Sequence, residues 1–180
     1  MTTTRIAVLV GSLRPDSLNR RVAETLRDQA PADVELDIID EIGQLPFYEE
    51  SLDAASTPAA AVTVRERVAA ADVVLAVTPE YNGTMPAVLN NAIDWLSRPY
   101  GEGAIVGKPF GVLGTTPTPY GGKWAHADAA RSAGIAGASV VETAVHSQTG
   151  IDVDVLAPEI FARFTEVVRT LAEARQSAAA

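Results

Sequence analysis

Five short apolar runs alternate with five segments of helical periodicity, and this alternation limits the folds open to the chain. The runs are expected to be β-strands, at residues 6–10, 34–39, 73–77, 110–113 and 138–145. Val73-Val74-Leu75-Ala76-Val77 is the strongest of them, since an uninterrupted apolar run is typical of a strand buried on both faces. The alternation predicts a parallel sheet covered by helices on both faces and joined by right-handed crossovers.

Helices are expected after each of these strands. The first carries Leu18, Val22 and Leu26 at helical spacing, with Asp16 or Ser17 as its N-cap. The others are predicted to begin near Pro58 as first helical residue, near Pro86 with Thr84 as N-cap, at Trp124 and at Pro158. Residues 40–52 are expected to form a loop, in which Phe47 and Tyr48 pack rather than bind a ligand.

Composition excludes several classes of function. The chain has 180 residues, the length of one domain over residues 1–180, and its net charge of −9 argues against nucleic-acid binding. It has no cysteine, so disulfides and thiolate chemistry are excluded, and its two histidines, His126 and His146, lack the spacing of metal ligands. No apolar run approaches membrane-spanning length and no signal peptide is evident, so we expect a cytoplasmic protein without a metal or membrane partner.

Three loops with unusual residues follow the first, third and fourth predicted strands. They cover residues 11–20, 78–86 and 114–122. In the flavodoxin-like strand order 2-1-3-4-5 these three strands are neighbours, and ligands bind beyond the carboxyl ends of such strands. The sequence therefore predicts a flavodoxin-like three-layer α/β sandwich with a five-stranded parallel sheet, and one binding site where the loops meet.

The first loop has the residues of an anion cradle. Gly11 allows close approach of a ligand to the backbone, Ser12, Ser17 and Asn19 offer hydrogen bonds, and Arg14 and Arg20 offer positive charge. The loop also opens a helix, whose N-terminal N–H groups attract phosphate. A serine or aspartate before a helix can equally be an ordinary N-cap, and neither the G-x-G-x-x-G nor the Walker pattern is present.

Two segments resemble the motifs of a known family. Gly11-Ser12-Leu13-Arg14-Pro15-Asp16-Ser17-Leu18-Asn19-Arg20 is similar to the G-S-x-R-x-x-S-x-N-R loop of NADPH-dependent FMN reductases. Residues 78–99, beginning Thr78-Pro79-Glu80-Tyr81-Asn82-Gly83 and containing Asp94-Trp95-Leu96-Ser97-Arg98, resemble that family's second motif. The family includes quinone, azo-dye and chromate reductases of flavodoxin-like fold.

The resemblance implies a flavin site with no catalytic side chain, because the flavin carries the chemistry. The FMN phosphate would lie on the first loop, and the ring and ribityl chain would border the second and third loops, whose backbone N–H groups would favour the reduced flavin. The implied cofactor-binding residues are Gly11, Ser12, Arg14, Ser17, Leu18, Asn19, Pro79, Glu80, Tyr81, Asn82, Gly83, Thr115, Gly121 and Gly122.

The implied function is transfer of hydride from NADPH or NADH through FMN to a small-molecule acceptor such as a quinone, an azo compound or free flavin. The alternatives are a flavodoxin-type FMN electron carrier without a nicotinamide site, a protein that uses FMN as a dissociating substrate, and a non-catalytic redox-sensing or interaction module. The family also implies a homodimer or homotetramer. We expect its interface on the helix that carries Asn91, Asp94, Trp95 and Arg98, unless Trp95 packs under a loop instead.

Overall fold

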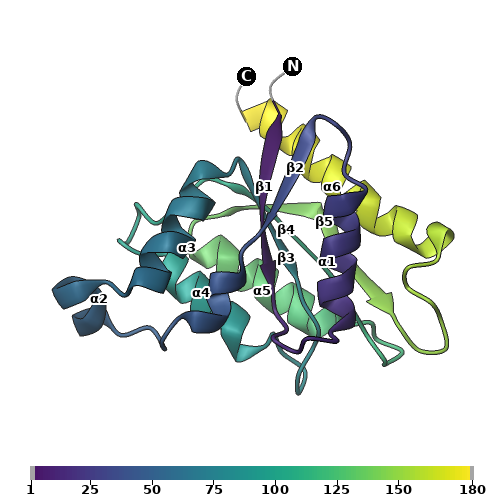
Figure 1. Cartoon of the computed structure of the whole chain (residues 1–180), viewed down its shortest axis with the longest axis horizontal. Helices are drawn as coiled ribbons and strands as arrows, with labels where there is room; N and C mark the ends of the chain where they lie inside the picture. The colour runs from purple at the N-terminus through teal and green to yellow at the C-terminus, as the bar shows by residue number, and fades with distance from the viewer. Residues whose placement is uncertain (1–2, 179–180) are drawn as a thin grey trace.

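A five-stranded parallel sheet forms the centre of the protein (Figure 1). The computed structural model describes residues 3–178. The strands run in the order β2-β1-β3-β4-β5, with bounds β1 Thr4–Val10, β2 Val34–Ile38, β3 Val73–Val77, β4 Pro109–Thr116 and β5 Ser139–Thr149. This is the flavodoxin-like order, so the predicted fold and its strand order are confirmed.

Helices cover both faces of the sheet and complete the three layers. On one face lie α1 (Leu18–Asp28) and α6 (Pro158–Ala178), and on the other lie α3 (Ala59–Ala70), α4 (Ala87–Leu96) and α5 (Lys123–Ile135) (Figure 1). Strand β1 shows why its apolar run is unbroken: Ala7 and Leu9 pack in one core cluster, and Ile6, Val8 and Val10 in the other. Successive side chains of a strand point to opposite faces, so both must be apolar when both faces are covered.

Several predicted boundaries differ from the structure. The segment expected as a loop at residues 40–52 contains the 3-10 helix η1 (Asp40–Gln44) and the start of α2 (Glu50–Ser56). Thr84 is not the N-cap of α4: Pro86 holds that position, and the Thr84 hydroxyl donates instead to the Asp128 carboxylate. Pro58 likewise lies at the N-cap of α3 rather than at its first helical residue. Both prolines have extended backbone, with ψ near 143°, which ends the preceding loop before the helix begins.

The expectation of a surface stripe on α4 is wrong for two of its four residues. Trp95 is fully buried and Asn91 is nearly so, because the segment Leu45–Tyr48 crosses over them. The Trp95 indole N–H donates to the Pro46 carbonyl at 2.8 Å, and its ring meets the Tyr48 ring edge-on at 5.1 Å. The alternative, that Trp95 packs under a loop, is therefore confirmed, whereas the neighbouring Phe47 is 82% exposed and does not pack as predicted.

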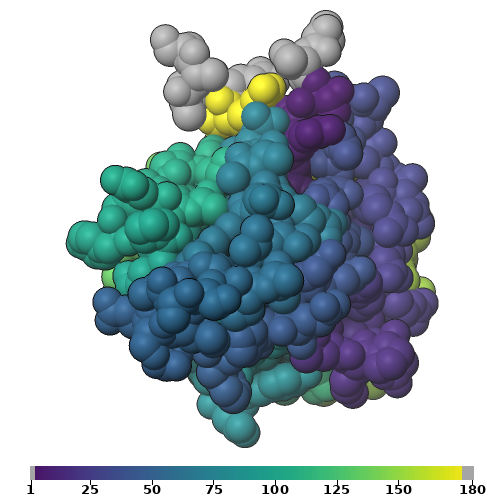
Figure 2. Space-filling model, turned by 60° about the vertical axis from the view of Figure 1, so that its left-hand side comes forward, coloured from purple at the N-terminus to yellow at the C-terminus, as the bar shows by residue number. Residues whose placement is uncertain are grey.

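An ion pair holds α2 against α3 on the same face. The Arg65 guanidinium donates to both carboxylate oxygens of Asp53, at 2.8 and 2.7 Å, and also donates to the Trp95 carbonyl at 3.0 Å. The guanidinium carbon Cζ of Arg65 lies 5.2 Å from the centre of the Trp95 ring, a distance typical of a cation–π contact. The segment around α2, in blue in Figure 2, forms part of the outer surface of the protein. Arg65 thus ties this outer segment to the buried tryptophan.

Asp53→Asn is expected to lower the free energy of unfolding by about 1.5–3 kcal/mol at pH 7, the range for hydrogen bonds to charged groups. The guanidinium of Arg65 holds the pKa of Asp53 below its ordinary 3.8. A depressed folded-state pKa means that the pair stabilises above pH 3.8 and that this contribution is lost as the pH falls through the folded-state value. Urea unfolding at pH 7 and pH 3 should therefore show a smaller difference from wild type at pH 3.

Asp28→Asn is the matched control for that experiment. Asp28 pairs with the adjacent Arg27 at 3.0 Å, but both side chains are about half exposed or more. Exposed pairs of this kind contribute little, so its unfolding free energy should change by less than about 0.5 kcal/mol. Equal losses in the two variants would show that the Asp53–Arg65 pair has no special role in holding α2.

Residues 3–178 lack both a helix that could span a membrane and a cluster of metal-ligating side chains. None of the helices in this range has both the length and the apolar composition needed to cross a bilayer. Nor does the range contain three or more histidine, aspartate or glutamate side chains grouped as metal ligands.

Candidate functional site

A cavity of about 590 Å³ lies at the carboxyl ends of β1, β3 and β4, where the three predicted loops meet. Its lining residues come from all three loops and from the turn after β5, and are Ser12, Arg14, Ser17, Leu18, Asn19, Pro79, Glu80, Tyr81, Thr115, Thr116, Pro117, Thr118 and Gly150. Nine of these thirteen belong to the predicted set. The structure therefore brings most of the predicted residues together around one cavity.

The first loop places the start of α1 against this cavity. Ser17 is the N-cap, and its hydroxyl accepts from the Arg20 backbone N–H at 3.3 Å. The Ser17 backbone N–H donates to the Arg14 carbonyl at 3.1 Å, which closes the loop into a tight turn. The first N–H groups of a helix have no acceptor within it, so this end of α1 can bind an anion.

Gly11 lies behind the lining rather than in it. Its N–H donates to the Val77 carbonyl at 2.9 Å, and a Cβ at this position would lie 2.2 Å from the Thr78 hydroxyl oxygen. Gly11 therefore lets the first and second loops approach each other closely. Its contact with a ligand stays a prediction.

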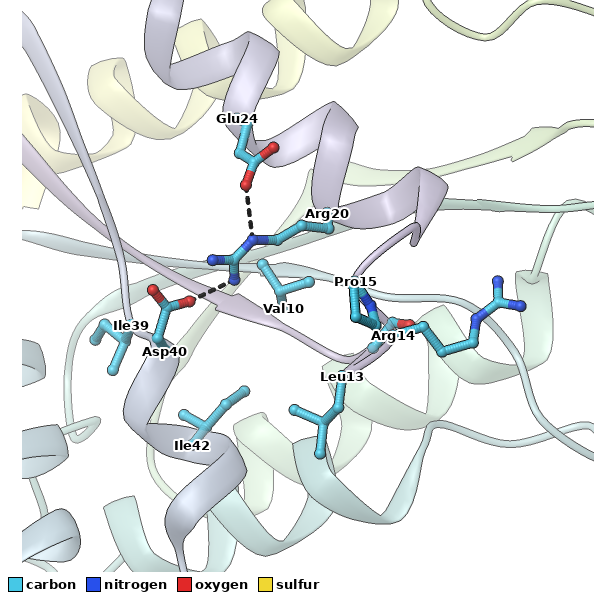
Figure 3. A pocket seen from close by; sticks show the side chains of 10 residues that line it. Val10, Leu13, Arg14, Pro15, Arg20, Glu24, Ile39, Asp40 and Ile42 are labelled. Carbon is cyan, nitrogen blue, oxygen red and sulfur yellow. Dashed lines mark hydrogen bonds and ion pairs between the residues drawn. The ribbon is translucent and has the colours of Figure 1, made fainter.

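The two arginines of the first loop differ in their surroundings, as Figure 3 shows around a second cavity of about 380 Å³. Arg20 donates to Glu24 at 2.9 Å and forms an ion pair with Asp40, so its charge is already compensated. Arg14 lines both cavities, and its side chain extends away from Arg20, with no ion pair to the residues drawn there (Figure 3). Of the two arginines, Arg14 is therefore the better candidate for an anion ligand, and its contact with the FMN phosphate stays a prediction.

The side chain of Asn19 forms hydrogen bonds with the backbone at the end of β4, where the third loop begins. Its side-chain amide donates to the Thr115 carbonyl at 2.9 Å, and its oxygen accepts from the Thr115 N–H at 2.9 Å. This pair ties α1 to the end of β4 and uses both polar groups of the Asn19 side chain. Asn19 thus shapes the cavity wall.

Two buried hydroxyls of the lining lack a partner. Ser12 Oγ and Thr115 Oγ1 form no hydrogen bond with any residue of the described range 3–178. A buried polar atom without a partner costs about 1–3 kcal/mol, so a water molecule or a polar ligand that bonds these two hydroxyls from the cavity would stabilise the protein. Together with Arg14 and the N-terminus of α1, these hydroxyls fit the oxygen-rich phosphate and ribityl groups of FMN.

The second loop contains a tight turn outside the cavity. Tyr81 and Thr84 exchange two backbone hydrogen bonds, and Asn82 and Gly83 between them have φ of 53° and 76°. Positive φ at both central residues is the type I′ geometry that Asn-Gly favours. Asn82 and Gly83 are exposed and do not line the cavity, so the structure explains them by the turn, and their role in flavin binding stays a prediction.

Glu80 lines the cavity, but its carboxylate is held by α5. One Glu80 oxygen accepts from the Trp124 and Ala125 backbone N–H groups, at 3.1 Å each. A carboxylate at a helix N-terminus is stabilised by the free N–H groups and by the helix dipole. Since the N-cap of α5, Gly122, has no side chain, Glu80 supplies the cap from the second loop.

The third loop meets the cavity through its first half. Thr116, Pro117, Thr118 and the distant Gly150 line it, and none of these was among the predicted residues. Gly121 and Gly122 instead turn the chain into α5 with φ of 63° and 90°. The sequence signal for Thr116–Thr118 is their place at the end of a strand, although β4 extends to Thr116 and not to residue 113 as predicted. Gly150 is held beside them because its N–H donates to the Thr116 carbonyl at 2.8 Å, and the Thr149 hydroxyl donates to the Thr118 carbonyl at 2.7 Å.

Few backbone N–H groups of these loops are free to face a flavin. Pro79 and Pro117 have none, Tyr81 N–H donates to Thr84, and Thr115 N–H donates to Asn19. Among lining residues of the second and third loops outside the strands, this leaves Glu80 and Thr118 as candidate donors. The expectation that backbone N–H groups of the second and third loops favour the reduced flavin stays a prediction, with one candidate donor in each loop.

The sequence profile of the NADPH-dependent FMN reductase family matches residues 4–152. The chain belongs to this family. The family predicted from the two motifs is therefore correct. Membership also confirms the predicted class, an oxidoreductase with FMN as cofactor and a nicotinamide nucleotide as donor.

Two proteins with sequences similar to this chain are described as quinone reductases. A 2-hydroxy-1,4-benzoquinone reductase of a Burkholderia species is 47% identical over 112 residues, which are 62% of this chain and 60% of the relative. A quinone reductase of Pseudomonas putida is 48% identical over 117 residues, 65% of this chain and 62% of the relative. The matched segments therefore span only about three fifths of the length of these relatives.

A solved structure matches over nearly the whole chain. FerB, a flavoenzyme NAD(P)H:(acceptor) oxidoreductase from Paracoccus denitrificans, is 32% identical, with 98% of this chain and 95% of FerB covered and a TM-score of 0.77. The last helix and the turn at Gly150, which is part of the cavity lining, thus fall within a shared fold.

Proposed function

We propose that the protein is an FMN-dependent oxidoreductase that reduces quinones with NADPH or NADH as donor. The observation that carries this proposal is the cavity at the carboxyl edge of the sheet, in which two buried hydroxyls without partners lie beside Arg14 and the N-terminus of α1. Support also comes from relatives described as quinone reductases. Azo compounds and free flavin are further candidate acceptors within the same proposal.

The chain's own residues would bind and orient the cofactor. Ser12, Arg14 and the N–H groups at the start of α1 would hold the phosphate, and Thr115 would donate or accept through its hydroxyl. Pro79 and Pro117 would present apolar surface that excludes water, while Glu80 and Thr118 N–H would donate where negative charge develops. Bound FMN supplies the hydride and electron transfer itself, so no side-chain nucleophile is required.

An anaerobic spectroscopic experiment tests the proposal. The purified protein is mixed with FMN, then with NADPH, and the visible flavin band is followed before and after addition of a benzoquinone. Bleaching by NADPH and recovery with the quinone are the expected results. A flavin that binds but is not reduced by NADPH or NADH would indicate the electron carrier instead, and loss of FMN on dialysis would indicate a dissociating flavin.

Arg14→Gln is expected to raise the Kd for FMN about 10- to 100-fold, because a charge-assisted hydrogen bond to phosphate contributes about 1.5–3 kcal/mol. Riboflavin, which lacks the phosphate, should bind the variant and the wild type equally. Fluorescence titration with both flavins measures the effect. Arg27→Gln, which removes the same charge at the other end of α1, is the matched control, and a parallel loss for riboflavin would contradict a phosphate role for Arg14.

Three further features are part of the proposal. The protein would be a homodimer or homotetramer in the cytoplasm, and residues 1–180 would form one domain. The exposed Asp94 and half-buried Arg98 are the residues of the expected α4 stripe that stay accessible for such an interface. Light scattering of the full chain at several concentrations measures the oligomeric state.

A further inference from the structure

His126 is fully buried on α5 and forms hydrogen bonds near the carboxyl ends of two strands, β3 and β5. Its Nε2 lies 2.9 Å from the Thr78 carbonyl oxygen, and its Nδ1 lies 2.6 Å from Ser147 Oγ. A carbonyl oxygen only accepts, so Nε2 carries the proton and Nδ1 accepts from the Ser147 hydroxyl. Burial lowers the pKa of His126, which is consistent with this neutral imidazole.

Thr78 connects this histidine to the cavity. It follows β3 directly and precedes Pro79, Glu80 and Tyr81, which line the cavity. Its N–H donates to the Leu113 carbonyl at 2.9 Å, and its hydroxyl donates to the Pro79 carbonyl at 3.0 Å. With His126 bound to its carbonyl, every polar group of Thr78 is engaged, so the direction in which the chain leaves β3 is fixed.

The same helix holds the second loop at two more points. Glu80 caps the backbone of Trp124 and Ala125, and Thr84 donates its hydroxyl to Asp128. The first two turns of α5 therefore contact the second loop before, within and after its cavity-lining residues. His126 makes the innermost of these contacts, since Thr78 is buried whereas Thr84 is exposed.

The backbone around His126 is shaped to admit its ring. A Cβ at Gly114 would lie 2.8 Å from His126 Nε2, and a Cβ at Gly122 would lie 3.0 Å from Cε1. Real Cβ atoms rarely come this close, so glycine at both positions leaves space for the imidazole. The ring is thus enclosed on two sides and has little freedom to change its contacts.

We infer that His126 is a positioning residue for the flavin site: by donating to the Thr78 carbonyl it sets the backbone of Pro79, Glu80 and Tyr81 at the cavity. This inference rests on the proposed function, since it takes the cavity to be the FMN site. His126 itself does not line the cavity. It acts on the flavin through the second loop, where Glu80 N–H is a candidate donor.

A matched pair of substitutions isolates the Thr78 contact. The amide of a glutamine is as many bonds from Cβ as Nε2 of histidine, so His126→Gln can still donate to Thr78. The amide of an asparagine corresponds to Nδ1, so His126→Asn keeps the Ser147 contact and loses that to Thr78. His146→Asn, the same change at the other histidine, which does not line the cavity, is the control.

His126→Asn is expected to raise the Kd for FMN about tenfold, and His126→Gln to keep it within about threefold of wild type. Because a displaced Glu80 N–H matters most for reduced flavin, the Asn variant should lose about tenfold more affinity for reduced than for oxidised FMN. This loss corresponds to a midpoint potential about 30 mV lower. Fluorescence titration gives the Kd, and spectroelectrochemistry gives the potential.

Equal FMN affinity and potential in the Asn, Gln and wild-type proteins would overturn the inference, and so would equal losses in the Asn and Gln variants. Thermal unfolding of each apoprotein shows whether it folds. If the Asn variant does not fold, the Gln variant decides, since a tenfold loss of affinity there would contradict rescue through Thr78. A wild-type protein that binds no FMN would instead contradict the proposed function.

Discussion

Gly114→Ala is expected to weaken FMN binding about 10- to 100-fold and to lower the Tm by about 6–12 °C. The new Cβ would lie 2.0 Å from the Thr78 carbonyl oxygen, 2.8 Å from His126 Nε2 and 2.9 Å from Asn19 Oδ1. All three atoms belong to the contacts that join the loops of the cavity, and the first is backbone, which moves only if β3 and β4 separate. Overpacking of this kind costs about 3 kcal/mol or more, and each kcal/mol lowers the Tm by about 2–4 °C in a chain of this size.

Gly107→Ala is the matched control for this prediction. Gly107 has φ of 73°, and a Cβ added there would have no atom of a non-neighbouring residue within 4 Å, so alanine is strained by its backbone alone. Gly107→Ala should lower the free energy of unfolding by about 1–2 kcal/mol and should leave the affinity for FMN unchanged. Differential scanning calorimetry and FMN titration on both variants measure the two effects. A Gly114→Ala protein that binds FMN as wild type does would show that the three loops are not coupled at this point.

Trp95→Ala is expected to lower the free energy of unfolding by about 3–5 kcal/mol, the range found for deletion of large buried aromatic side chains. The substitution removes the hydrogen bond to Pro46, the edge-on contact with Tyr48 and the cation–π contact with Arg65. Each of these partners belongs to the segment that covers α4 or to the helix beside it, so that segment should detach first. FMN affinity should change little, because residues 45–57 do not line the cavity.

Urea unfolding distinguishes this role of Trp95 from an intersubunit role. Trp124→Ala is the control, because the chain's other tryptophan is 46% exposed and packs mainly on Tyr120, at 4.7 Å. Its loss should cost about 1 kcal/mol. A Trp95→Ala protein that keeps its stability but changes its oligomeric mass would contradict the packing described here and restore the interface predicted from the sequence.

Local periodicity was sufficient to predict the sheet. Residues 73–77 form a strand in the structure as predicted, because an apolar run bounded by polar residues has one stable environment in an alternating chain, the centre of a parallel sheet. The positions of the three loops at one edge followed from the strand order alone. Most of the cavity lining was therefore predicted correctly as a set of segments.

The function of individual side chains was harder to predict than their location. Arg14 and Arg20 both offer positive charge in the first loop, and only the structure shows that Glu24 and Asp40 compensate the charge of Arg20 (Figure 3). Glu80 lines the cavity as expected, and only the structure shows that its carboxylate caps α5. Trp95 has the spacing of an exposed stripe, yet the segment around Pro46, 49 residues earlier, covers it. In each case a residue's role depends on a partner distant in the chain.

Strand and helix periods and loop motifs are local properties, so the alternating α/β sheet and the family of the chain could be predicted without coordinates. Which polar groups are engaged, and which are left for a ligand, depends on contacts between distant segments and became known only from the packed fold. The side chain of Asn19 forms two hydrogen bonds with the backbone of Thr115, which lies 96 residues away. The side-chain hydroxyls of Ser12 and Thr115, by contrast, are buried without a partner. A hydrogen bond needs its two atoms within about 3 Å, and only the packed fold fixes distances on that scale.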